Sequence, residues 1–449
     1  MGWSEEFDQL ANDTNLSVCI IGLGYVGLPT AIGFFEAGYN VWGVDISQKS
    51  VDKIMNGINP TGDKEIDGLI PDSNTPRWNI TTSTSKAVPK CDVVIVTVPT
   101  PVTKDLKPDL SFIYEAGKSI FKSIKKNENT IVVLESTVYP GVTNQTWLPL
   151  IEKFGLKEGI DIEIAYCPER FNPGDPSNGV RKVARVIGAR NPKIGHSLVQ
   201  LYKKLTSGDV RYVGRIEVAE AAKVVENVQR DINIALVNEL ARIFPEMGVD
   251  VEDVLSAAET KWNFHRYTPG VGVGGHCIPV DPYYMMQRAA DVGVPAELIT
   301  AARAVNKTMP IHVANNINDI LYKNDVLSGN GRVLLLGWSY KPEVGDPRET
   351  PAEDLWRTLH SKDIGVTVYD SHLDKSDFPQ GVDIVDSPYD AKDIDMVVLI
   401  TAHQSCINID WGRLKNVVNK PLIFDGRRVL DTAALSETGW LVYGVGMPL

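Results

Sequence analysis

Short apolar runs alternate with helix-like segments in the first part of the chain. Residues 17–21 form an apolar run rich in β-branched side chains, which is typical of a buried parallel strand. A helical pattern over residues 28–37 follows, and a second apolar run covers residues 40–44. The alternation continues to about residue 210, with further strand-like runs at 92–98 and 130–134. The pattern predicts a doubly wound α/β domain.

The pattern changes in the middle of the chain. Residues 216–244 show a long helical pattern without glycine or proline, and further helical segments extend to about residue 324. A glycine-rich stretch at residues 269–282 interrupts these segments. The sequence therefore predicts a mainly helical middle domain.

The strand–helix alternation returns after Gly331. Predicted strands at 332–336, 366–370 and 395–400 and a helix at 351–360 repeat the plan of the N-terminal part. We therefore predict an α/β protein with two doubly wound Rossmann-like domains joined by a mainly helical middle domain. The expected domains are residues 1–210, 211–324 and 325–449.

Composition and charge narrow the functional classes. Hydrophobic residues make up 43% and charged residues 23% of the 449 positions, which excludes a mainly disordered chain. The formal net charge is −12, so the surface has no general attraction for nucleic acid or anionic membranes. Residues 18–35 carry no charge, but four glycines and Pro29 within them argue against a membrane span.

Five cysteines are scattered along the chain, and none lies in a CxxC pair or at metal-ligand spacing with histidine. This distribution predicts a reducing compartment, no disulfide framework and no metal site. The N-terminal residues 1–10 are acidic and lack a secretory signal pattern, so we expect a cytoplasmic protein.

A glycine triad, GLGYVG, lies between the first predicted strand and helix. There Gly22 permits a tight turn, Gly24 lets the backbone approach a pyrophosphate, and Gly27 lets strand and helix pack closely. Asp45 follows the next strand, where its carboxylate could bind both adenine-ribose hydroxyls and would repel a 2′-phosphate. The spacing predicts binding of NAD rather than NADP. A structural glycine turn, with Asp45 as a strand-end cap, is the alternative. The corresponding turn at Gly337 lacks the triad, so we expect a different ligand or binding mode there.

Two threonines at predicted strand ends are further candidates for cofactor contacts. Thr100 follows the run at 92–98, and Thr137 follows the run at 130–134. Ligands of open α/β sheets gather at the carboxyl ends of the strands. Loop capping is the alternative role for both residues.

The glycine-rich stretch contains the most informative cysteine, Cys277. Its glycines let the main chain bend tightly and leave the thiol accessible, and a thiol near a helix start or a cation ionises more readily. Asp281 could orient a water or a proton, and His276 is either a base or a residue that shapes the loop. We interpret Cys277 as a nucleophile; a small buried hydrophobe is the alternative.

Lys223, Asn227 and Arg230 recur at i, i+4 and i+7 and so share one face of the long predicted helix. Such a stripe offers donors and positive charge to a developing oxyanion. A solvated helix face is the alternative. Five neighbouring apolar residues favour a largely enclosed helix instead: Ala221, Ala222, Val224, Val225 and Val228.

In this order, the motifs resemble the UDP-glucose/GDP-mannose dehydrogenase family of NAD-dependent four-electron oxidoreductases. The resemblance covers nearly the whole chain after about residue 16. Four segments look most like UDP-N-acetylhexosamine 6-dehydrogenases: residues 168–174, 230–235, 260–264 and 274–282. UDP-glucose enzymes usually carry a second glutamate where this chain has Pro173. The segments do not separate the GlcNAc, GalNAc and ManNAc epimers.

The resemblance implies an NAD-binding N-terminal domain, a dimerising middle domain and a UDP-binding C-terminal domain. The catalytic residues it implies are Cys277, Lys223, Asn227, Asp281, Glu169 and Thr137. The implied cofactor contacts are Gly22, Gly24, Tyr25, Val26, Gly27, Asp45, Thr100, Thr137 and Arg348. The implied substrate contacts are Glu169, Arg170, Phe171, Lys223, Asn227, Arg230, Tyr267, Gly270, Tyr340, Lys341 and Arg427.

The predicted activity is oxidation of the C6 alcohol of a UDP-N-acetylhexosamine to the uronic acid, through a thiohemiacetal and a thioester on Cys277. Expected partners are the UDP-sugar and further copies of the chain, in a homodimer or higher homo-oligomer. Three alternatives stay open: a UDP-glucose 6-dehydrogenase, a two-electron hydroxyacid dehydrogenase that would not require Cys277, and a nucleotide-sugar sensor that binds NAD without turnover.

Overall fold

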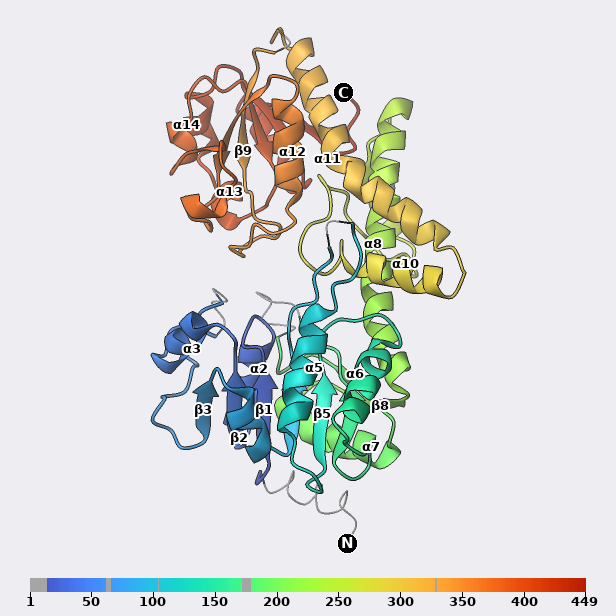
Figure 1. The fold of residues 1–449 in the computed structure, drawn as a ribbon. Helices are drawn as coiled ribbons and strands as arrows, with labels where there is room; N and C mark the ends of the chain where they lie inside the picture. Colours follow the sequence, from blue (N-terminus) through green and yellow to red (C-terminus); the bar gives the residue numbers. More distant parts are fainter. Residues whose placement is uncertain (1–13, 62–65, 104, 172–178, 328) are drawn as a thin grey trace. The chain divides into compact units, whose positions relative to one another are not determined.

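Two compact units make up the chain (Figure 1). The computed structural model describes residues 14–61, 66–103, 105–171, 179–327 and 329–449. The first unit comprises the described residues up to Glu226 together with Tyr283–Val294, and the second comprises Asn227–Pro282 and Pro295–Leu449. The division falls within the long helix α8 (Ile216–Ile243).

An eight-stranded sheet forms the centre of the first unit, in the order β3-β2-β1-β4-β5-β6-β7-β8. Strands β1 to β6 run parallel, whereas β7 pairs antiparallel with β6. The first six strands have the Rossmann order. The strands are β1 (Ser17–Ile21), β2 (Asn40–Val44), β3 (Trp78–Thr81), β4 (Val93–Val96), β5 (Thr130–Leu134), β6 (Ile162–Tyr166), β7 (Arg185–Ala189) and β8 (Val210–Gly214).

Helices cover both faces of this sheet (Figure 1). Val18 and Ile20 of β1 join a core cluster with residues of α2 and α7, while Cys19 and Ile21 join a second cluster with residues of α5 and α6. A strand that is buried on both faces needs a continuous apolar run, which explains the sequence of β1. The helices are α2 (Gly27–Glu36), α3 (Gln48–Met55), α4 (Thr84–Ala87), α5 (Ser111–Ser123), α6 (Val142–Lys153) and α7 (Pro192–Leu205).

The middle of the chain is helical, as predicted. It contains α8, α9 (Val251–Glu259), α10 (Asp281–Asp291) and α11 (Glu297–Lys323). Within the second unit, Val237 and Ala241 of α8 share a buried core with Met309 and Val313 of α11. That core continues under the second sheet through Val333 of β9.

The second sheet is parallel throughout and has the order β11-β10-β9-β12-β13-β14. This is the order of the first six strands of the first sheet, so the prediction of a second Rossmann-like domain is confirmed. Its strands are β9 (Arg332–Leu336), β10 (Gly365–Tyr369), β11 (Asp383–Ile384), β12 (Met396–Leu399), β13 (Leu422–Asp425) and β14 (Leu441–Gly444). Its helices are α12 (Pro351–His360), α13 (Gln404–Ile407), α14 (Trp411–Lys415) and α15 (Thr432–Glu437).

Short 3-10 helices complete the described elements: η2 (Val88–Lys90), η3 (Phe244–Met247), η4 (Lys375–Asp377) and η5 (Pro388–Asp390). Among the described residues, no helix has the length and apolarity needed to cross a bilayer. The uncharged stretch at 18–35 forms β1, the glycine turn and most of α2. The N-terminal segment at residues 1–10, for which no secretory signal is predicted, lies outside the described residues.

Candidate active site

The glycine triad forms the turn between β1 and α2. Gly22 has a φ of +93°, which favours glycine, and its N–H donates to the Val44 carbonyl at 2.8 Å. A Cβ on Gly27 would lie 1.8 Å from the Gly22 carbonyl oxygen, whereas a Cβ on Gly24 would meet nothing within 4 Å. Gly27 therefore has no room for a side chain, and Gly24 borders open space.

The N-terminus of α2 has no side chain that competes for its backbone donors. Its N-cap residue, Val26, makes no side-chain capping bond, and its first turn contains no acidic residue. The Leu28 N–H donates to the Gly24 carbonyl at 3.1 Å, and Pro29 has no N–H to offer. Amides at a helix start attract anions because they have no partner within the helix. Tyr25 is half-buried just before this start. The arrangement fits the phosphates of a dinucleotide.

Asp45 lies directly after β2 and is half-buried. Its Oδ2 accepts the Leu23 N–H at 2.8 Å, and its Oδ1 accepts the Ser47 N–H at 2.8 Å. These bonds hold the carboxylate beside the glycine turn. A carboxylate in this position fits the ribose hydroxyls of NAD and repels the 2′-phosphate of NADP.

The carboxyl ends of β4 and β5 adjoin the same turn, because β4 pairs with β1 and β5 with β4. Thr97 Oγ1 donates to the Gly22 carbonyl at 2.8 Å. Thr100 and Thr137 follow these strands and are half-buried. The Thr100 carbonyl accepts the Tyr284 hydroxyl at 2.7 Å. Both predicted threonines thus follow strands at the edge where a Rossmann domain binds its ligand.

A buried charged cluster, which the sequence analysis missed, adjoins Glu169. Arg185 is fully buried, and its Nη2 pairs with Glu169 Oε2 at 2.5 Å while its Nη1 lies 3.4 Å from Glu135 Oε1. The Tyr202 hydroxyl donates to Glu135 Oε1 at 2.6 Å. Burial raises the pKa of Glu135, and the charge of Arg185 opposes that shift. An arginine at the head of the apolar run RVIGA was the available signal for this cluster.

The other oxygen of Glu169 binds the backbone. Glu169 Oε1 accepts the N–H groups of Arg170 at 2.7 Å and of Phe171 at 2.5 Å. The Arg170 guanidinium pairs with Glu226 at 2.6 Å. Glu169 is 7% exposed, so its carboxylate has a fixed orientation. The adjoining residues 172–178, which include Pro173, lie outside the described residues.

The structure describes all five cysteines, and Cys277 is more exposed than the other four. Cys277 is half-buried, whereas Cys19, Cys91, Cys167 and Cys406 are buried, and none of the five forms a disulfide. The Cys277 carbonyl accepts the N–H groups of the residues at 280 and 281, at 3.1 and 2.8 Å, so the cysteine lies in the turn that leads into α10. A helix start favours a thiolate over a thiol.

Two predicted catalytic residues meet next to this turn. Asn227 of α8 donates its Nδ2 hydrogen to Asp281 Oδ2 at 2.5 Å, and Asp281 is 2% exposed. Lys223 lies one turn before Asn227 on α8, is half-buried and belongs to the first unit. Arg230, the third residue of the predicted stripe, is exposed.

The expectation that this part of α8 is largely enclosed holds for one face of the helix only: Val224 and Val228 are buried, whereas Val225 is 51% exposed. Four apolar side chains of α8 are between 47% and 53% exposed: Val218, Val225, Leu236 and Ile243. Their spacing of 7, 11 and 7 residues places them on one face of the helix. Of the five apolar residues that suggested enclosure, only Val225 belongs to this exposed face, which we call the apolar stripe of α8.

The glycine-rich turn before Cys277 packs against Tyr340. Gly275 has a φ of +88°, and a Cβ on it would lie 2.7 Å from the Tyr340 ring. His276 is exposed, and its Nδ1 lies 3.5 Å from an Arg348 nitrogen. Arg348 in turn forms an ion pair with Asp346 at 2.6 Å. Burial would raise the pKa of Asp346, but the hydrogen bonds from Arg348 outweigh it and lower that pKa.

Gly270 lies beside Arg427 in the second unit. The Gly270 N–H donates to Asn238 Oδ1 at 2.9 Å, and a Cβ on Gly270 would lie 3.2 Å from an Arg427 nitrogen. Burial lowers the pKa of Arg427. The Tyr267 hydroxyl donates to Gln229 at 3.3 Å. Lys341 is half-buried, directly after Tyr340.

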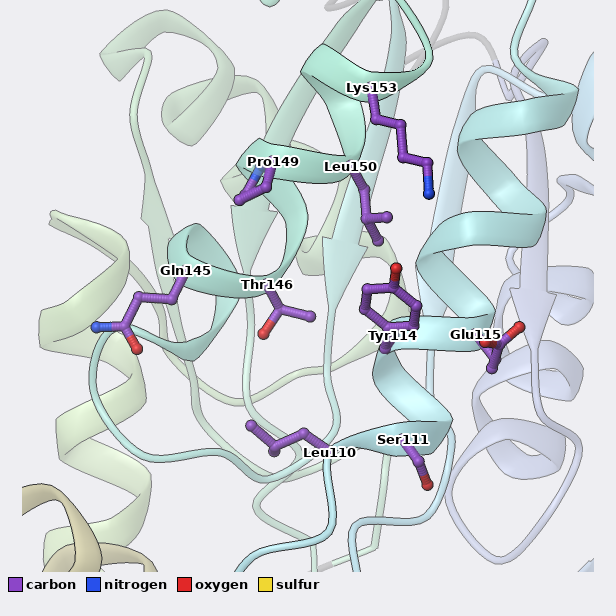
Figure 2. Close-up of a pocket in the computed structure, with 9 residues that line it drawn as sticks. All are labelled: Leu110, Ser111, Tyr114, Glu115, Gln145, Thr146, Pro149, Leu150 and Lys153. Atoms are coloured by element: carbon purple, nitrogen blue, oxygen red, sulfur yellow. The ribbon is translucent and has the colours of Figure 1, made fainter.

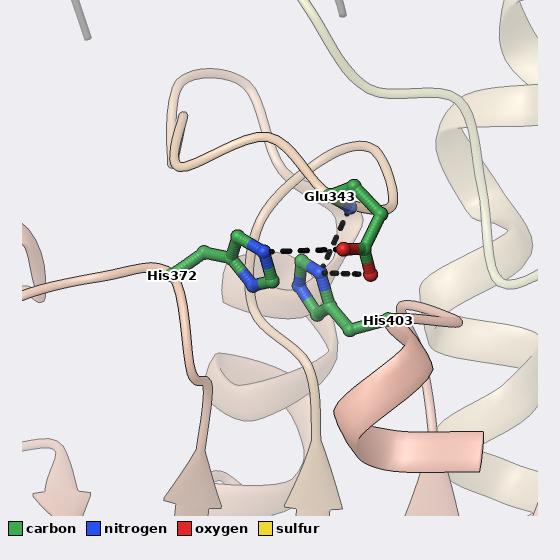
Figure 3. A group of neighbouring side chains, drawn as sticks. All are labelled: Glu343, His372 and His403. Atoms are coloured by element: carbon green, nitrogen blue, oxygen red, sulfur yellow. Dashed lines mark hydrogen bonds and ion pairs between the residues drawn. The ribbon is translucent and has the colours of Figure 1, made fainter. Parts of the chain in front are cut away.

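Glu343, His372 and His403 gather at the carboxyl edge of the second sheet (Figure 3). His403 Nδ1 accepts the Glu343 N–H at 3.0 Å, and His403 Nε2 lies 3.1 Å from Asp370 Oδ2. The two imidazole rings stack with centroids 4.3 Å apart and planes 14° apart. Nearly parallel rings direct their lone pairs into separate planes, so this geometry does not fit one ion bound by both.

A surface cavity of about 480 Å³ lies between α5 and α6 (Figure 2). None of the predicted site residues lines it. Its walls combine apolar and polar side chains: Leu110, Ser111, Tyr114, Glu115, Gln145, Thr146, Pro149, Leu150 and Lys153.

The glycine turn, the acid after β2 and the uncapped start of α2 define a protein that binds a dinucleotide, joined in one chain to a second Rossmann-like domain. Three models of the UDP-glucose/GDP-mannose dehydrogenase family match this chain. They are the NAD binding domain at residues 16–206, the central domain at 217–308 and the UDP binding domain at 334–432. The chain belongs to this family.

Individual relatives are similar over nearly their whole length. The UDP-N-acetyl-D-glucosamine 6-dehydrogenase of Pseudomonas aeruginosa is 38% identical over 93% of this chain and 98% of its own. The UDP-N-acetyl-D-mannosamine dehydrogenase of Methanocaldococcus jannaschii is 33% identical over 97% of each chain. The solved structure of a UDP-D-ManNAc dehydrogenase from Pyrococcus horikoshii superimposes with a TM-score of 0.86, at 29% identity over 96% of this chain and 99% of that one.

These matches confirm the family predicted from the sequence and its NAD cofactor. The protein is an NAD-dependent dehydrogenase that oxidises a nucleotide sugar and has a UDP-binding C-terminal domain.

Proposed function

We propose that the protein oxidises the C6 hydroxymethyl group of a UDP-N-acetylhexosamine to a carboxylate and thereby supplies a uronic acid for polysaccharide biosynthesis. The names of the relatives support the substrate class. The observation that carries the four-electron chemistry is Cys277, the one half-buried cysteine, in the turn before α10 beside the Asn227–Asp281 pair.

The reaction balances as one alcohol, one water and two NAD⁺ giving one carboxylate, two NADH and three protons. When bound, NAD⁺ accepts the hydride lost in each oxidation. The glycine triad with Tyr25 and Val26 would hold its phosphates, Asp45 the adenine ribose, and Thr100, Thr137 and Arg348 are proposed as further contacts.

In the first oxidation, the hydroxyl proton leaves through a water held by Lys223, Asp281 and Thr137. Asp281 is suited to orient a water because its carboxylate is buried and already fixed by Asn227. The product of this step is the C6 aldehyde.

The second oxidation needs a covalent bond to the enzyme. The Cys277 thiolate adds to the aldehyde carbon, and the resulting thiohemiacetal loses a hydride to become a thioester. Water then attacks the thioester, with Glu169 as the base, and the thiolate leaves. Lys223 and Asn227 donate to the oxyanion that forms at each addition. Arg185 and the two backbone amides keep the Glu169 carboxylate in one orientation.

Further residues are proposed as substrate contacts. Tyr340, Lys341 and Arg427 would bind the UDP moiety, and Arg230 the N-acetyl group. Arg170, Phe171, Tyr267 and Gly270 are proposed as additional sugar contacts. We propose domain boundaries at 210/211 and 324/325 and a cytoplasmic location.

The apolar stripe of α8 supports a homodimer or a higher homo-oligomer. An exposed row of apolar side chains along a helix is typical of a surface covered by another chain. A second copy of this chain would present the same stripe, as a twofold axis requires.

The substrate assignment is tested with UDP-GlcNAc, UDP-GalNAc, UDP-ManNAc and UDP-glucose, each incubated with NAD⁺ while NADH absorbance is followed. We expect two NADH for each N-acetylated sugar consumed. The Cys277→Ala variant should form no uronic acid. Faster turnover of UDP-glucose than of every N-acetylated sugar contradicts the substrate class. One NADH per sugar, or normal uronate formation by Cys277→Ala, contradicts the mechanism.

A further inference from the structure

The segment between β9 and α12 carries Tyr340 and Lys341. We call residues 337–348 the Tyr340 loop. It contains no helix or strand, since β9 ends at Leu336 and α12 begins only at Pro351. Ordering such a connection costs conformational entropy, so contacts that hold it before the ligand arrives increase affinity.

Asp370 holds the start of the Tyr340 loop. Its Oδ2 accepts the Trp338 N–H at 2.7 Å and the Ser339 N–H at 2.9 Å. Thr401 adds a bond from its hydroxyl to the Ser339 carbonyl at 2.5 Å. Asp370, Trp338, Ser339 and Thr401 are all buried, so water competes little with these bonds.

His403 holds the loop three residues beyond Tyr340. Because a backbone N–H can only donate, the 3.0 Å contact from the Glu343 N–H makes His403 Nδ1 an acceptor. The ring proton is then on Nε2, from which it is donated to Asp370 Oδ2 at 3.1 Å. His403 is fully buried, and its ring stacks against that of His372, as Figure 3 shows. Both anchors of the loop therefore meet at one carboxylate oxygen.

From this geometry we propose that His403 and Asp370 are a positioning pair that orders the Tyr340 loop to receive the UDP moiety. Tyr340 and Lys341 lie between the two anchored points, at Ser339 and Glu343. The inference rests on the proposed function in that it takes Tyr340 and Lys341 as substrate contacts.

Two substitutions of His403 each remove one of its two hydrogen bonds and keep the other. In His403→Asn the amide oxygen takes the place of Nδ1 and can still accept the Glu343 N–H, while the bond to Asp370 is lost. In His403→Gln the amide reaches the place of Nε2 and can still donate to Asp370, while the bond to Glu343 is lost. His360→Gln, which changes an exposed histidine of the same unit, is the matched control.

The experiment measures the dissociation constant of UDP by calorimetry on the full chain, and then KM and kcat with UDP-GlcNAc and NAD⁺. We expect His403→Gln to weaken UDP binding and raise the KM for the sugar about three- to tenfold, the effect of one lost hydrogen bond. The KM for NAD⁺ should not change. His403→Asn should show a smaller effect, and His360→Gln none.

A role in stability alone predicts another result, because partial unfolding lowers kcat through the amount of active enzyme and leaves the affinity for UDP unchanged. UDP affinities equal to the wild type in both His403 variants, or a larger effect of His403→Asn than of His403→Gln, overturn the proposal. If the wild type binds UDP with the expected ranking of variants but oxidises no UDP-sugar, the proposed function fails and the positioning pair stands.

Discussion

The turns at Gly22 and Gly337 have the same backbone conformation and hydrogen-bond pattern at the carboxyl edges of the two sheets. Each glycine has a positive φ, +93° and +88°, and each donates its N–H at 2.8 Å to the last residue of the neighbouring strand. An aspartate follows that strand in both cases. Asp45 and Asp370 each accept the N–H of the residue after the glycine, at 2.8 and 2.7 Å.

The two turns differ in what they leave open. Asp45 is half-buried, and α2 begins directly after the turn with no capping side chain. Asp370 is buried, its Oδ2 also faces His403, and α12 begins with a Thr350 cap and two acidic residues in its first turn. The first arrangement offers a carboxylate and a helix start to a dinucleotide. In the second turn, His403 already binds the Asp370 carboxylate and Thr350 already caps the start of α12. A ligand there must therefore bind other residues, such as those of the Tyr340 loop.

The largest effect is expected at the glycine that the first turn has and the second lacks. Gly27→Ala would place a Cβ 1.8 Å from the Gly22 carbonyl oxygen, a backbone atom that cannot swing aside. We expect a loss of about 3 kcal/mol of stability, the upper range for overpacking, measured by urea unfolding.

Gly24→Ala is the matched control for stability, because its Cβ would meet no atom within 4 Å. Its unfolding midpoint should lie close to the wild type. Equal destabilisation by both substitutions would contradict the packing role of Gly27.

An intermediate effect, on cofactor binding, is expected at Asp45, the half-buried aspartate. Asp45→Asn keeps the size of the side chain but removes the charge that repels a 2′-phosphate. We expect the KM for NAD⁺ to rise about tenfold, equivalent to about 1.4 kcal/mol, and the preference for NAD⁺ over NADP⁺ to shrink. Steady-state kinetics with both cofactors measure this. Asp370→Asn should leave the preference unchanged, and an equal change in both variants would remove the distinction between the two turns.

The smallest effect is expected for Asp370, the buried aspartate, and concerns how the stability of the protein changes at acid pH. Burial would raise the pKa of Asp370, but hydrogen bonds from His403 and the backbone outweigh it and hold that pKa well below the ordinary value of 3.8. The unfolded chain therefore takes up this proton first on acidification. The stabilisation by Asp370 is present above that ordinary value and declines as the pH falls below it.

Between about pH 6 and about pH 3.5 this loss should stay below about 1 kcal/mol. Urea unfolding of the wild type and Asp370→Asn at both pH values measures it, and the stability difference between the two proteins should narrow in acid. A difference that widens in acid would show that the carboxylate is not held in its charged form.

Much of the fold follows from local patterns. The runs at residues 17–21, 130–134 and 332–336 coincide with β1, β5 and β9, because strands buried on both faces require continuous apolar runs. The antiparallel pairing of β7 with β6 was not predicted, because strand direction depends on the path of the connection and not on the strand's own residues.

The site residues also fall into those that the sequence could predict and those that it could not. The glycine triad, Asp45 and Cys277 could be selected from the sequence because their chemistry depends on neighbours within a few residues: a turn, a strand end or a helix start. Arg185 and His403 could not, because each is an ordinary residue until the fold surrounds it with partners. Arg185 meets Glu135 across 50 residues and His403 meets Glu343 across 60.

The order of residues along the chain was thus enough for the two Rossmann-like domains and the cofactor, and it selected Cys277 as the proposed nucleophile, since short-range geometry governs each of these. Which aspartate stays accessible beside its glycine turn, and which is enclosed by a histidine, was decided only when the chain folded. Burial and hydrogen bonding depend on the surroundings that distant segments create. In the sequence, Asp45 and Asp370 share the same position, directly after an apolar strand, and that position does not tell them apart.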